Sequence, residues 1–451
     1  MALYPERIQH SYPCSSVHIG TMPNHRAAAR VADKIPVQIK PAHVPAPHTI
    51  NTRTLNISAK GICFRLRDQI PSGSFTCEFP LKKRGKVSSI KFTGAIVWST
   101  AIDRGWLYGA HLVPDPSFEK DIAAFIAERA FLEKAFDEEL SAYLTALTVL
   151  DIEIAEADVT PTTHNRIFHQ LRRICTRVIQ MGDKWTSTFY AEEIKNQIKA
   201  RFRSAVGTQV YQSNIMRRGI EKPQGYAGDY QTIEFIYENQ PISATKGLAR
   251  YLDEYFLEND LSIAVRNRKN KMLTHLLHLI DLSDKNDIKI LNIACGSCRE
   301  IKELFQSALV DDKKLSFTCI DQDGDALAYS AKALADTTPS NVSMKFCHEN
   351  VVNLLRRKNS AAAFGKFNLV YSIGLIDYLS DRLLKNFIKF CWDMLEVDGT
   401  LVLTHKDCRK RLAFLPPDWF CDWTFYSREK NELLSLIRDT IDNFTMDVSW
   451  E

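Results

Sequence analysis

The sequence lacks any long uninterrupted apolar run, and charge of one sign is barely in excess. No run approaches the length of a membrane span, and the first twenty residues, with Pro5, Glu6 and Arg7, do not form the apolar stretch of a signal peptide. A net charge of +4 over 451 residues does not demand a nucleic-acid duplex or an anionic membrane as partner. We therefore expect a cytoplasmic protein with no membrane span.

The sequence also lacks the pattern of a disulfide framework and that of a catalytic triad. The eleven cysteines are odd in number and scattered, which suits free thiols in a reducing compartment better than disulfides. Cys295 and Cys298 form a C-x-x-C that could be a redox pair or half of a zinc site, but no second such pair or suitably spaced histidine follows. We therefore expect no metal site, and we find no convincing Ser-His-Asp constellation.

The composition is that of an ordinary globular protein, with 45% hydrophobic and 25% charged residues and a length suited to two or three domains. We see no internal repeat and no low-complexity tract. The pattern divides the chain into three regions, residues 20–118, 119–284 and 285–451. They predict a multidomain protein with a small antiparallel β-barrel, a helical region and an α/β doubly wound sheet.

The first region shows the alternation of apolar and polar residues that is typical of short β-strands. It is clear at residues 62–64, 75–79, 90–98 and 106–113, and Gly, Pro, Asp and Ser break the runs between them. Several such runs in about one hundred residues predict a small antiparallel barrel.

Two short motifs lie at the start of this region. Arg26 and Arg30 have three residues between them, and Asn56, Ser58 and Gly61 follow in Leu-Asn-Ile-Ser-Ala-Lys-Gly-Ile. In this order and strand context they resemble the cyclic di-GMP site of the PilZ domain. The resemblance implies that the arginines clamp the phosphates and guanine faces, which guanidinium groups do by bidentate bonding and stacking, while the strand end binds the opposite side. The alternative is a barrel with a solvated basic N-terminal arm.

The second region, residues 119–284, has apolar residues spaced by three and four, which predicts packed helices. The loop at residues 222–230 interrupts them with two glycines and a proline beside polar and aromatic groups. A loop of this kind inside a domain is more often a site than a connector. Tyr226, Asp229 and Tyr230 are therefore candidates for lining a reaction site.

The third region repeats strand, turn and helix. Strands are expected at residues 288–294, 315–320, 343–348, 367–373 and 399–405, with helical segments between them. This alternation predicts a doubly wound, Rossmann-like parallel sheet that binds its ligands at the carboxyl ends of the strands.

Polar residues follow these strands in an order that resembles the class I S-adenosylmethionine-dependent methyltransferases. The resemblance implies that Ala294 and Gly296, in the turn after the first strand, let the backbone approach the methionine part of the cofactor. It also implies that Asp321 accepts hydrogen bonds from both ribose hydroxyls and that Asn350 meets the adenine amino group. The fourth-strand motif, which includes Ser372, is expected to border the transferred methyl.

A dinucleotide-binding oxidoreductase also offers a glycine turn and an acid after the second strand. The fuller Gly-x-Gly-x-x-Gly is missing here because Ala294 and Ser297 or Cys298 occupy the neighbouring places, which disfavours a dinucleotide. A small Cys298 suits a close backbone turn, and this explains the C-x-x-C without redox chemistry.

Three segments narrow the resemblance to a bacterial branch that includes synthases of 3-hydroxy fatty acid methyl ester signals, namely residues 222–230, 264–269 and 422–428. An acceptor carboxylate is already ionised at neutral pH and needs no general base, so orientation and exclusion of water do most of the work. Arg266 and Arg268 could hold a carboxylate of cofactor or substrate, or could instead pair with Asp253, Glu254 or Glu258.

The candidates for the reaction site are Tyr226, Asp229, Tyr230, Asp377, Tyr378 and His405. Each is also a common packed aromatic, loop-stabilising acid or satisfied histidine. His405, at the end of the fifth strand, could orient an acceptor or act as a base for a hydroxyl or amine.

One departure from the methyltransferase pattern concerns the end of the sheet. Class I sheets close with a sixth strand and an antiparallel seventh, whereas the run at residues 444–451 offers only one. The leading hypothesis is a methyltransferase tuned by cyclic di-GMP, with the helices of residues 119–284 capping the cofactor site and carrying the signal. The alternatives are a non-catalytic effector with a degenerate fold and a methyltransferase of protein side chains.

Overall fold

The computed structural model describes residues 34–42, 49–58, 61–70, 73–83, 86–113, 116–158, 160–243, 247–310, 313–357, 360–407, 409, 411–442 and 444–449. Arg26 and Arg30 lie outside these residues. The chain forms two compact units, one with residues up to Leu150 together with Arg172–Gly207, the other with Asp151–Leu171 and Thr208–Glu451.

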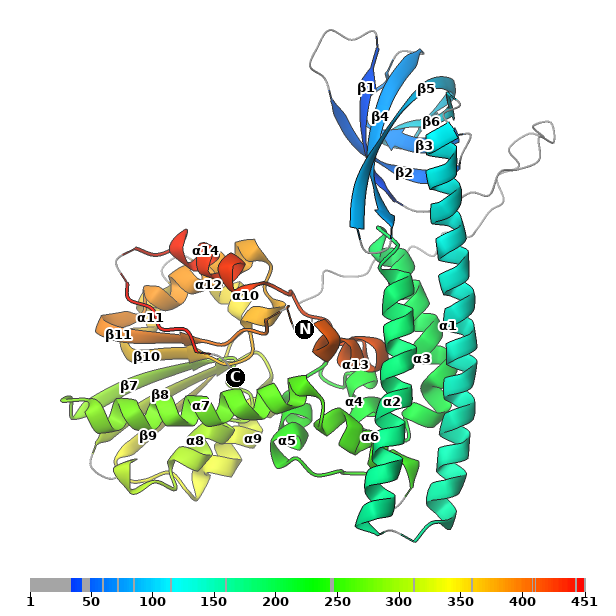
Figure 1. Cartoon of the computed structure of the whole chain (residues 1–451). Helices are drawn as coiled ribbons and strands as arrows, with labels where there is room; N and C mark the ends of the chain where they lie inside the picture. Colours follow the sequence, from blue (N-terminus) through cyan, green and yellow to red (C-terminus); the bar gives the residue numbers. More distant parts are fainter. Residues whose placement is uncertain are drawn as a thin grey trace. The chain divides into compact units, whose positions relative to one another are not determined.

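The first unit contains a closed six-stranded antiparallel barrel in the order β1-β2-β3-β6-β5-β4 (Figure 1). The strands are β1 Pro36–Pro41, β2 Ile50–Ser58, β3 Gly61–Leu66, β4 Ser74–Lys83, β5 Lys86–Ile102 and β6 Gly105–Leu112. Closure follows from β1, which pairs with both β2 and β4. Alternate apolar residues point inward, and the rings of Phe64 and Tyr108 stack at 5.4 Å. The barrel expected from the period-two pattern is confirmed.

Three helices complete this unit, α1 Pro116–Glu156, α2 Pro161–Thr186 and α3 Glu192–Val210, and each of them continues past its bounds. Ile122 and Phe125, in the first turns of α1, belong to the apolar core of the barrel. Further along α1, the ring of Phe136 lies 5.5 Å from Trp185 of α2 and 6.4 Å from Phe202 of α3. The three-and-four spacing thus buries one face of each helix.

The second unit contains a five-stranded sheet in the order β11-β10-β7-β8-β9, in which every pair is parallel. The strands are β7 Asp287–Ile293, β8 Lys314–Asp321, β9 Val342–His348, β10 Phe367–Ser372 and β11 Leu395–Leu403. The strand order and the parallel direction of every strand pair confirm the expected doubly wound sheet.

Helices cover both faces of this sheet (Figure 1). On one face α7 Asp260–Leu282, α8 Arg299–Leu304 and α9 Gly324–Ala335 pack against side chains such as Ile290 and Phe317. On the other, α10 Val351–Arg356, α12 Asp381–Trp392 and α14 Lys430–Arg438 pack against Leu291 and Val370. Because Ile290 and Leu291 are neighbours, the strand is apolar toward both layers, as parallel sheets require.

Smaller helices stand before and after this core. They are α4 Asn214–Glu221, α5 Tyr230–Glu238, α6 Leu248–Leu257, α11 Ser360–Phe364 and α13 Arg411–Cys421. Among the described residues, none of the helices combines the length and the apolar character that crossing a membrane requires.

The expectation of a strand at residues 444–451 is wrong for the residues that the structure describes there, 444–449, which pair with no strand. The run packs through side chains instead, with the ring of Phe444 at 6.1 Å from Trp392. Asp447, Met446 and Val448 are exposed, so the run presents no face for burial. Within the described residues β11 is an outer strand.

Candidate functional site

The turn after β7 has an unusual backbone. Ala294, Gly296 and Cys298 have φ angles of 58°, 54° and 51°, in the left-handed region that suits glycine. A Cβ added at Gly296 would meet no heavy atom within 4 Å, so the space beside the turn is open. Two non-glycine residues held in this region indicate a turn fixed by its surroundings.

Asp321, the last residue of β8, holds this turn. Its Oδ2 accepts a hydrogen bond from the Gly296 N–H at 2.8 Å, and its Oδ1 accepts one from the Asp323 N–H at 2.9 Å. Burial raises the pKa of Asp321 to about 6, against the two N–H donors that favour the ionised form. At neutral pH the group is therefore a carboxylate, and each oxygen keeps capacity for a further donor.

Asn350 lies after β9, as predicted, but both ends of its amide are engaged. The Oδ1 caps α10 by accepting from the Asn353 N–H, and the Nδ2 donates to Oε1 of Gln322 at 2.7 Å. A contact with adenine through Asn350 requires exchange of one of these bonds, so its role in binding stays a prediction.

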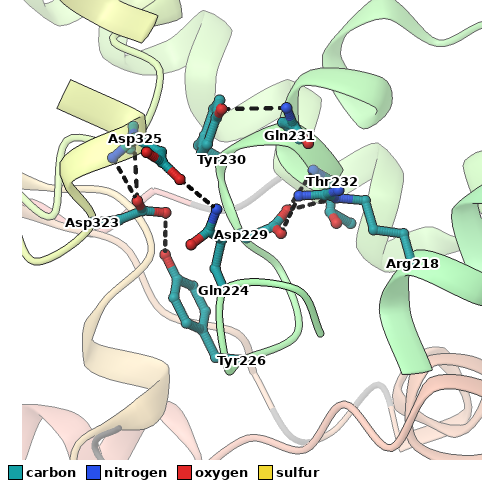
Figure 2. A network of polar contacts seen from close by, with 10 residues as sticks. Arg218, Gln224, Tyr226, Asp229, Tyr230, Gln231, Thr232, Asp323 and Asp325 are labelled. Atoms are coloured by element: carbon teal, nitrogen blue, oxygen red, sulfur yellow. Dashed lines mark hydrogen bonds and ion pairs between the residues drawn. The ribbon is translucent and has the colours of Figure 1, made fainter. Parts of the chain in front are cut away.

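The loop before α5 contacts the residues that follow β8, as Figure 2 shows. The Tyr226 hydroxyl donates to Oδ2 of Asp323 at 3.5 Å, and Gln224 donates to Asp325 at 3.0 Å. Burial raises the pKa of the Tyr226 phenol, and the carboxylates of Asp321 and Asp323 raise it further, so the group remains a neutral donor.

Asp229 and Tyr230 are placed differently from Tyr226. Asp229 caps α5 through the Thr232 N–H at 2.8 Å and forms an ion pair with Arg218, which donates from Nε at 3.1 Å (Figure 2). The Tyr230 hydroxyl accepts from Gln231 at 3.2 Å. Asp229 thus stabilises the loop, and the structure shows no contact of either residue with Asp321.

A glycine and a tryptophan connect this loop to the segment after β10, which contains Tyr378. A Cβ added at Gly228 would lie 2.3 Å from the ring of Trp423, so a larger residue would displace that ring. The Trp423 Nε1 donates to the hydroxyl of Tyr378 at 2.7 Å. Tyr378 is therefore held by the segment at residues 422–428 that sequence analysis singled out.

A buried charge cluster lies where β10 and β11 end. Asp377 is 1% exposed, its Oδ1 lies 2.7 Å from Nδ1 of His405, and its Oδ2 accepts from Nζ of Lys406 at 2.6 Å. Although burial opposes it, the neighbouring Lys406 ammonium and His405 ring hold the pKa of Asp377 well below its ordinary value. Burial lowers the pKa of Lys406, and the nearby Arg268 guanidinium adds to this.

Several buried polar atoms around this cluster have no hydrogen-bond partner among the described residues. They are the Ser372 Oγ, the Thr404 Oγ1, the His405 Nε2 and the Arg268 Nε. Buried polar atoms are almost always paired, so a group of unpaired ones at the carboxyl ends of adjacent strands indicates a place where a ligand supplies the partners.

The two arginines of α7 have different neighbours. Arg266 donates to the carbonyl of Leu257 at 2.9 Å and lies 3.8 Å from the Glu258 carboxylate, which is the pairing that sequence analysis left open. Arg268 lies against the motif after β10, where a Cβ on Gly374 would be 3.1 Å from its Nη2. Arg268, rather than Arg266, is beside the unpaired atoms.

A large groove of about 1930 Å3 opens beside this cluster. Its apolar lining comes from β11, α12, α14 and the run that follows, and it includes Trp392, Leu401, Leu433, Ile437 and Phe444. Arg268, His405, Lys406 and Arg409 line it as well. An apolar groove with a few convergent polar groups is typical of a small-molecule site.

The predicted nucleotide-site residues of the barrel occupy one end of a hairpin. Asn56 and Ser58 lie in β2, and Ser58 is directly opposite Gly61 of β3. A Cβ at Gly61 would be 3.0 Å from the carbonyl oxygen of Ala110, which explains the glycine. The two arginines of the motif fall outside the described residues, so the complete site stays a prediction.

Comparison with protein families finds two matches. Residues 24–128 match the PilZ domain, and residues 178–367 match the family described as putative methyltransferase. The chain thus carries a PilZ domain followed by a methyltransferase domain, and both resemblances at this level are confirmed. No curated protein matches the sequence significantly. The narrower resemblance to hydroxy fatty acid methyl ester synthases stays a prediction.

Solved structures of low identity resemble parts of the chain. An inhibitor of motility from Bacillus subtilis is 18% identical over 24% of this chain, with a TM-score of 0.21, and the chain spans about half, 52%, of that protein. A possible exported protein from Bordetella parapertussis is 14% identical over 68% of this chain and 89% of its own, with a TM-score of 0.36. Magnesium protoporphyrin IX methyltransferase from Synechocystis PCC 6803, solved with bound SAM, is 9% identical over 40% of this chain and 73% of its own, with a TM-score of 0.28.

Proposed function

We propose that the protein transfers a methyl group from S-adenosylmethionine to the carboxylate of an acyl molecule, and that cyclic di-GMP bound to the PilZ domain changes this activity. The family match supports the methyltransferase part. The observation that carries the choice of acceptor is the group of unpaired polar atoms beside cations and an apolar groove, close to the strand ends where class I enzymes bind their cofactor.

The residues present fit the cofactor. Asp321 presents a fixed carboxylate whose oxygens each retain acceptor capacity, which suits two ribose hydroxyls. The open space beside Gly296 suits close approach of the methionine part, and Tyr226 covers the same edge through Asp323. When bound, the sulfonium of the cofactor supplies a methyl carbon that an in-line nucleophile can attack.

The acceptor side fits a carboxylate with an apolar tail. Arg268 can donate two parallel hydrogen bonds to a carboxylate, and the Ser372 and Thr404 hydroxyls can donate to the same group. The apolar wall of the groove then buries the chain of the acyl group. Because the carboxylate is already ionised, the chemistry needs orientation and exclusion of water, and His405 serves by holding Asp377 and the ligand rather than by removing a proton.

Two measurements test the proposal in order. Calorimetry with S-adenosylmethionine on the full chain is expected to show one binding event per chain. The protein is then incubated with labelled cofactor and a cell extract, and the label is expected in the lipid fraction. Label in protein instead would favour a protein methyltransferase, and absence of both binding and label would leave a non-catalytic effector.

Arg268→Ala is expected to raise the KM for an acyl carboxylate and to leave cofactor affinity close to wild type. Loss of a charge-assisted hydrogen bond costs about 1.5–3 kcal/mol, or about 10- to 150-fold. Steady-state kinetics with calorimetry for the cofactor measure both quantities. Arg266→Ala is the matched control on the same helix, since Arg266 bonds Leu257. Equal KM values for the two variants would place the carboxylate elsewhere.

Arg30→Ala is expected to weaken cyclic di-GMP binding by about 1.5–3 kcal/mol, because one charge-assisted contact with the nucleotide is lost. Titration calorimetry on the full chain gives the affinity. Arg53→Ala removes an exposed arginine from β2 of the same barrel and is expected to bind like wild type. Unchanged affinity in Arg30→Ala would refute the assignment of the motif.

Cyclic di-GMP is expected to change methyl transfer through the helices that follow the barrel. No Gly/Ser-rich linker separates β6 from α1, and α1 begins by packing Ile122 and Phe125 into the barrel core. A coupling of about 1–3 kcal/mol corresponds to about a 5- to 150-fold change in affinity for the other ligand, and linkage makes it reciprocal. Cyclic di-GMP titrations with and without saturating cofactor measure it. Superimposable curves and unchanged turnover would mean independent domains.

A further inference from the structure

Three cysteines from different elements meet beside the cofactor turn. Cys295 and Cys298 belong to the turn after β7, and Cys319 lies in β8, opposite Asn292 of β7. Their Sγ atoms all lie within 4.8 Å of one another, and the residues are 7%, 1% and 0% exposed. Sequence analysis weighed only the pair and missed Cys319, which is 21 residues away from Cys298 and reaches the pair through the strand register.

The backbone fixes this triangle of sulfurs. The Cys298 N–H donates to the carbonyl of Cys295 at 3.1 Å, and the Cys295 N–H donates to the carbonyl of Ile320 at 3.1 Å, which ties the turn to β8. Cys319 is held opposite Asn292 by the parallel ladder. A Zn–S bond of about 2.3 Å places two sulfurs of a tetrahedral ion about 3.8 Å apart, within the spacing found here.

The charges around the triangle favour a cation. Asp321 follows Cys319 by two residues, and the buried carboxyl of Glu300 follows Cys298 by two. A buried thiolate near carboxyl groups is costly unless a positive charge neutralises it.

We propose that Cys295, Cys298 and Cys319 form a binding site for a thiophilic divalent cation, with Zn2+ as the ion that suits three sulfur ligands and one solvent molecule. Each coordinating thiol releases its proton to solvent, and no electron is transferred. The ion would tie the cofactor turn to β8 and thereby hold the backbone that carries Gly296. The site is separate from the acceptor groove and does not depend on the proposed reaction.

The test measures metal on the full chain. Protein is incubated with Zn2+ and desalted, and bound zinc is measured by mass spectrometry. One zinc per chain is expected for wild type, and Cys319→Ser is expected to lose it. Cys391→Ser is the matched control, because Cys391 is as completely buried in the apolar core on the other face of the sheet. Circular dichroism checks that each variant is folded.

Substitution with Co2+ keeps the test decisive if Cys319→Ser does not fold. Wild-type protein with Co2+ is expected to show the near-ultraviolet sulfur-to-cobalt absorption of thiolate ligands, displaced by one equivalent of Zn2+. Absence of that absorption, or zinc retained equally by Cys319→Ser, would overturn the site. A Cys295–Cys298 disulfide as the stable form of the purified protein would overturn it too.

Discussion

Asp321→Ala is expected to lose at least about 100-fold in affinity for S-adenosylmethionine. The variant removes the carboxylate that we propose as the acceptor for two ribose hydroxyls, and each hydrogen bond to a charged group is worth about 1.5–3 kcal/mol. It also releases the Gly296 N–H, which Asp321 holds at 2.8 Å, so the turn keeps the bond from the Cys295 N–H to Ile320 but loses this tie to β8. Calorimetry on the full chain measures the affinity.

Two further variants separate charge from loop geometry. Asp321→Asn keeps the size of the side chain and one acceptor, and it is expected to fall between wild type and Asp321→Ala. Asp336→Asn changes an exposed acid that ends α9, and it should bind the cofactor as wild type does. Wild-type affinity in Asp321→Ala would show that the cofactor pocket lies elsewhere.

Asp377→Asn is expected to lower the free energy of unfolding by about 3–5 kcal/mol, the cost of leaving a buried charge without its partner. Lys406 is 10% exposed and donates to Asp377 at 2.6 Å, so in the variant a largely buried ammonium is left without its carboxylate. Urea denaturation measures the change. Asp287→Asn is the control, because that carboxylate is 46% exposed and its partner Lys314 is 67% exposed, so the loss should be below about 1 kcal/mol.

A second substitution tests whether the pair is the cause. Lys406→Met in the Asp377→Asn background is expected to recover part of the loss, since no buried charge then remains. The pH dependence has a definite sign. Because the pKa of Asp377 is depressed on folding, the ion pair stabilises the protein above about pH 4, and this contribution is lost as the pH falls further. Additive single effects would contradict a coupled pair.

The strands and helices that follow from a local pattern of apolar residues could be predicted from the sequence. The alternation at residues 90–98 and 106–113 reflects a barrel with one buried face, and both segments are strands paired as β5 and β6. The repeat of strand and helix after residue 288 has the same basis, since each parallel strand needs a crossover helix. Asp321 is the last residue of β8, as expected, because it directly follows the apolar run that forms this strand.

Contacts between distant segments could not be read in this way. Lys406 is 29 residues from Asp377, and the sequence gives no sign that the lysine turns inward to it. Arg266 and Arg268 are two residues apart on one helix, about 200° around the axis, so they could not serve the same ligand. The sequence spacing predicts that the two arginines point to different sides of the helix. Which arginine points toward the strand ends depends on how α7 packs on the sheet.

The cofactor turn and the α14 wall of the groove come from different segments of the chain. Gly296, Asp321 and Asn350 lie within the region that matches the putative methyltransferase family, whereas Asp377, His405 and the groove-lining residues of α14 come after residue 367, where that match ends. Asp321 holds the glycine turn through the N–H of Gly296, and its other oxygen accepts from the N–H of Asp323. Substitutions in α14 can therefore reshape the apolar wall of the groove without touching the backbone hydrogen bonds that Asp321 accepts.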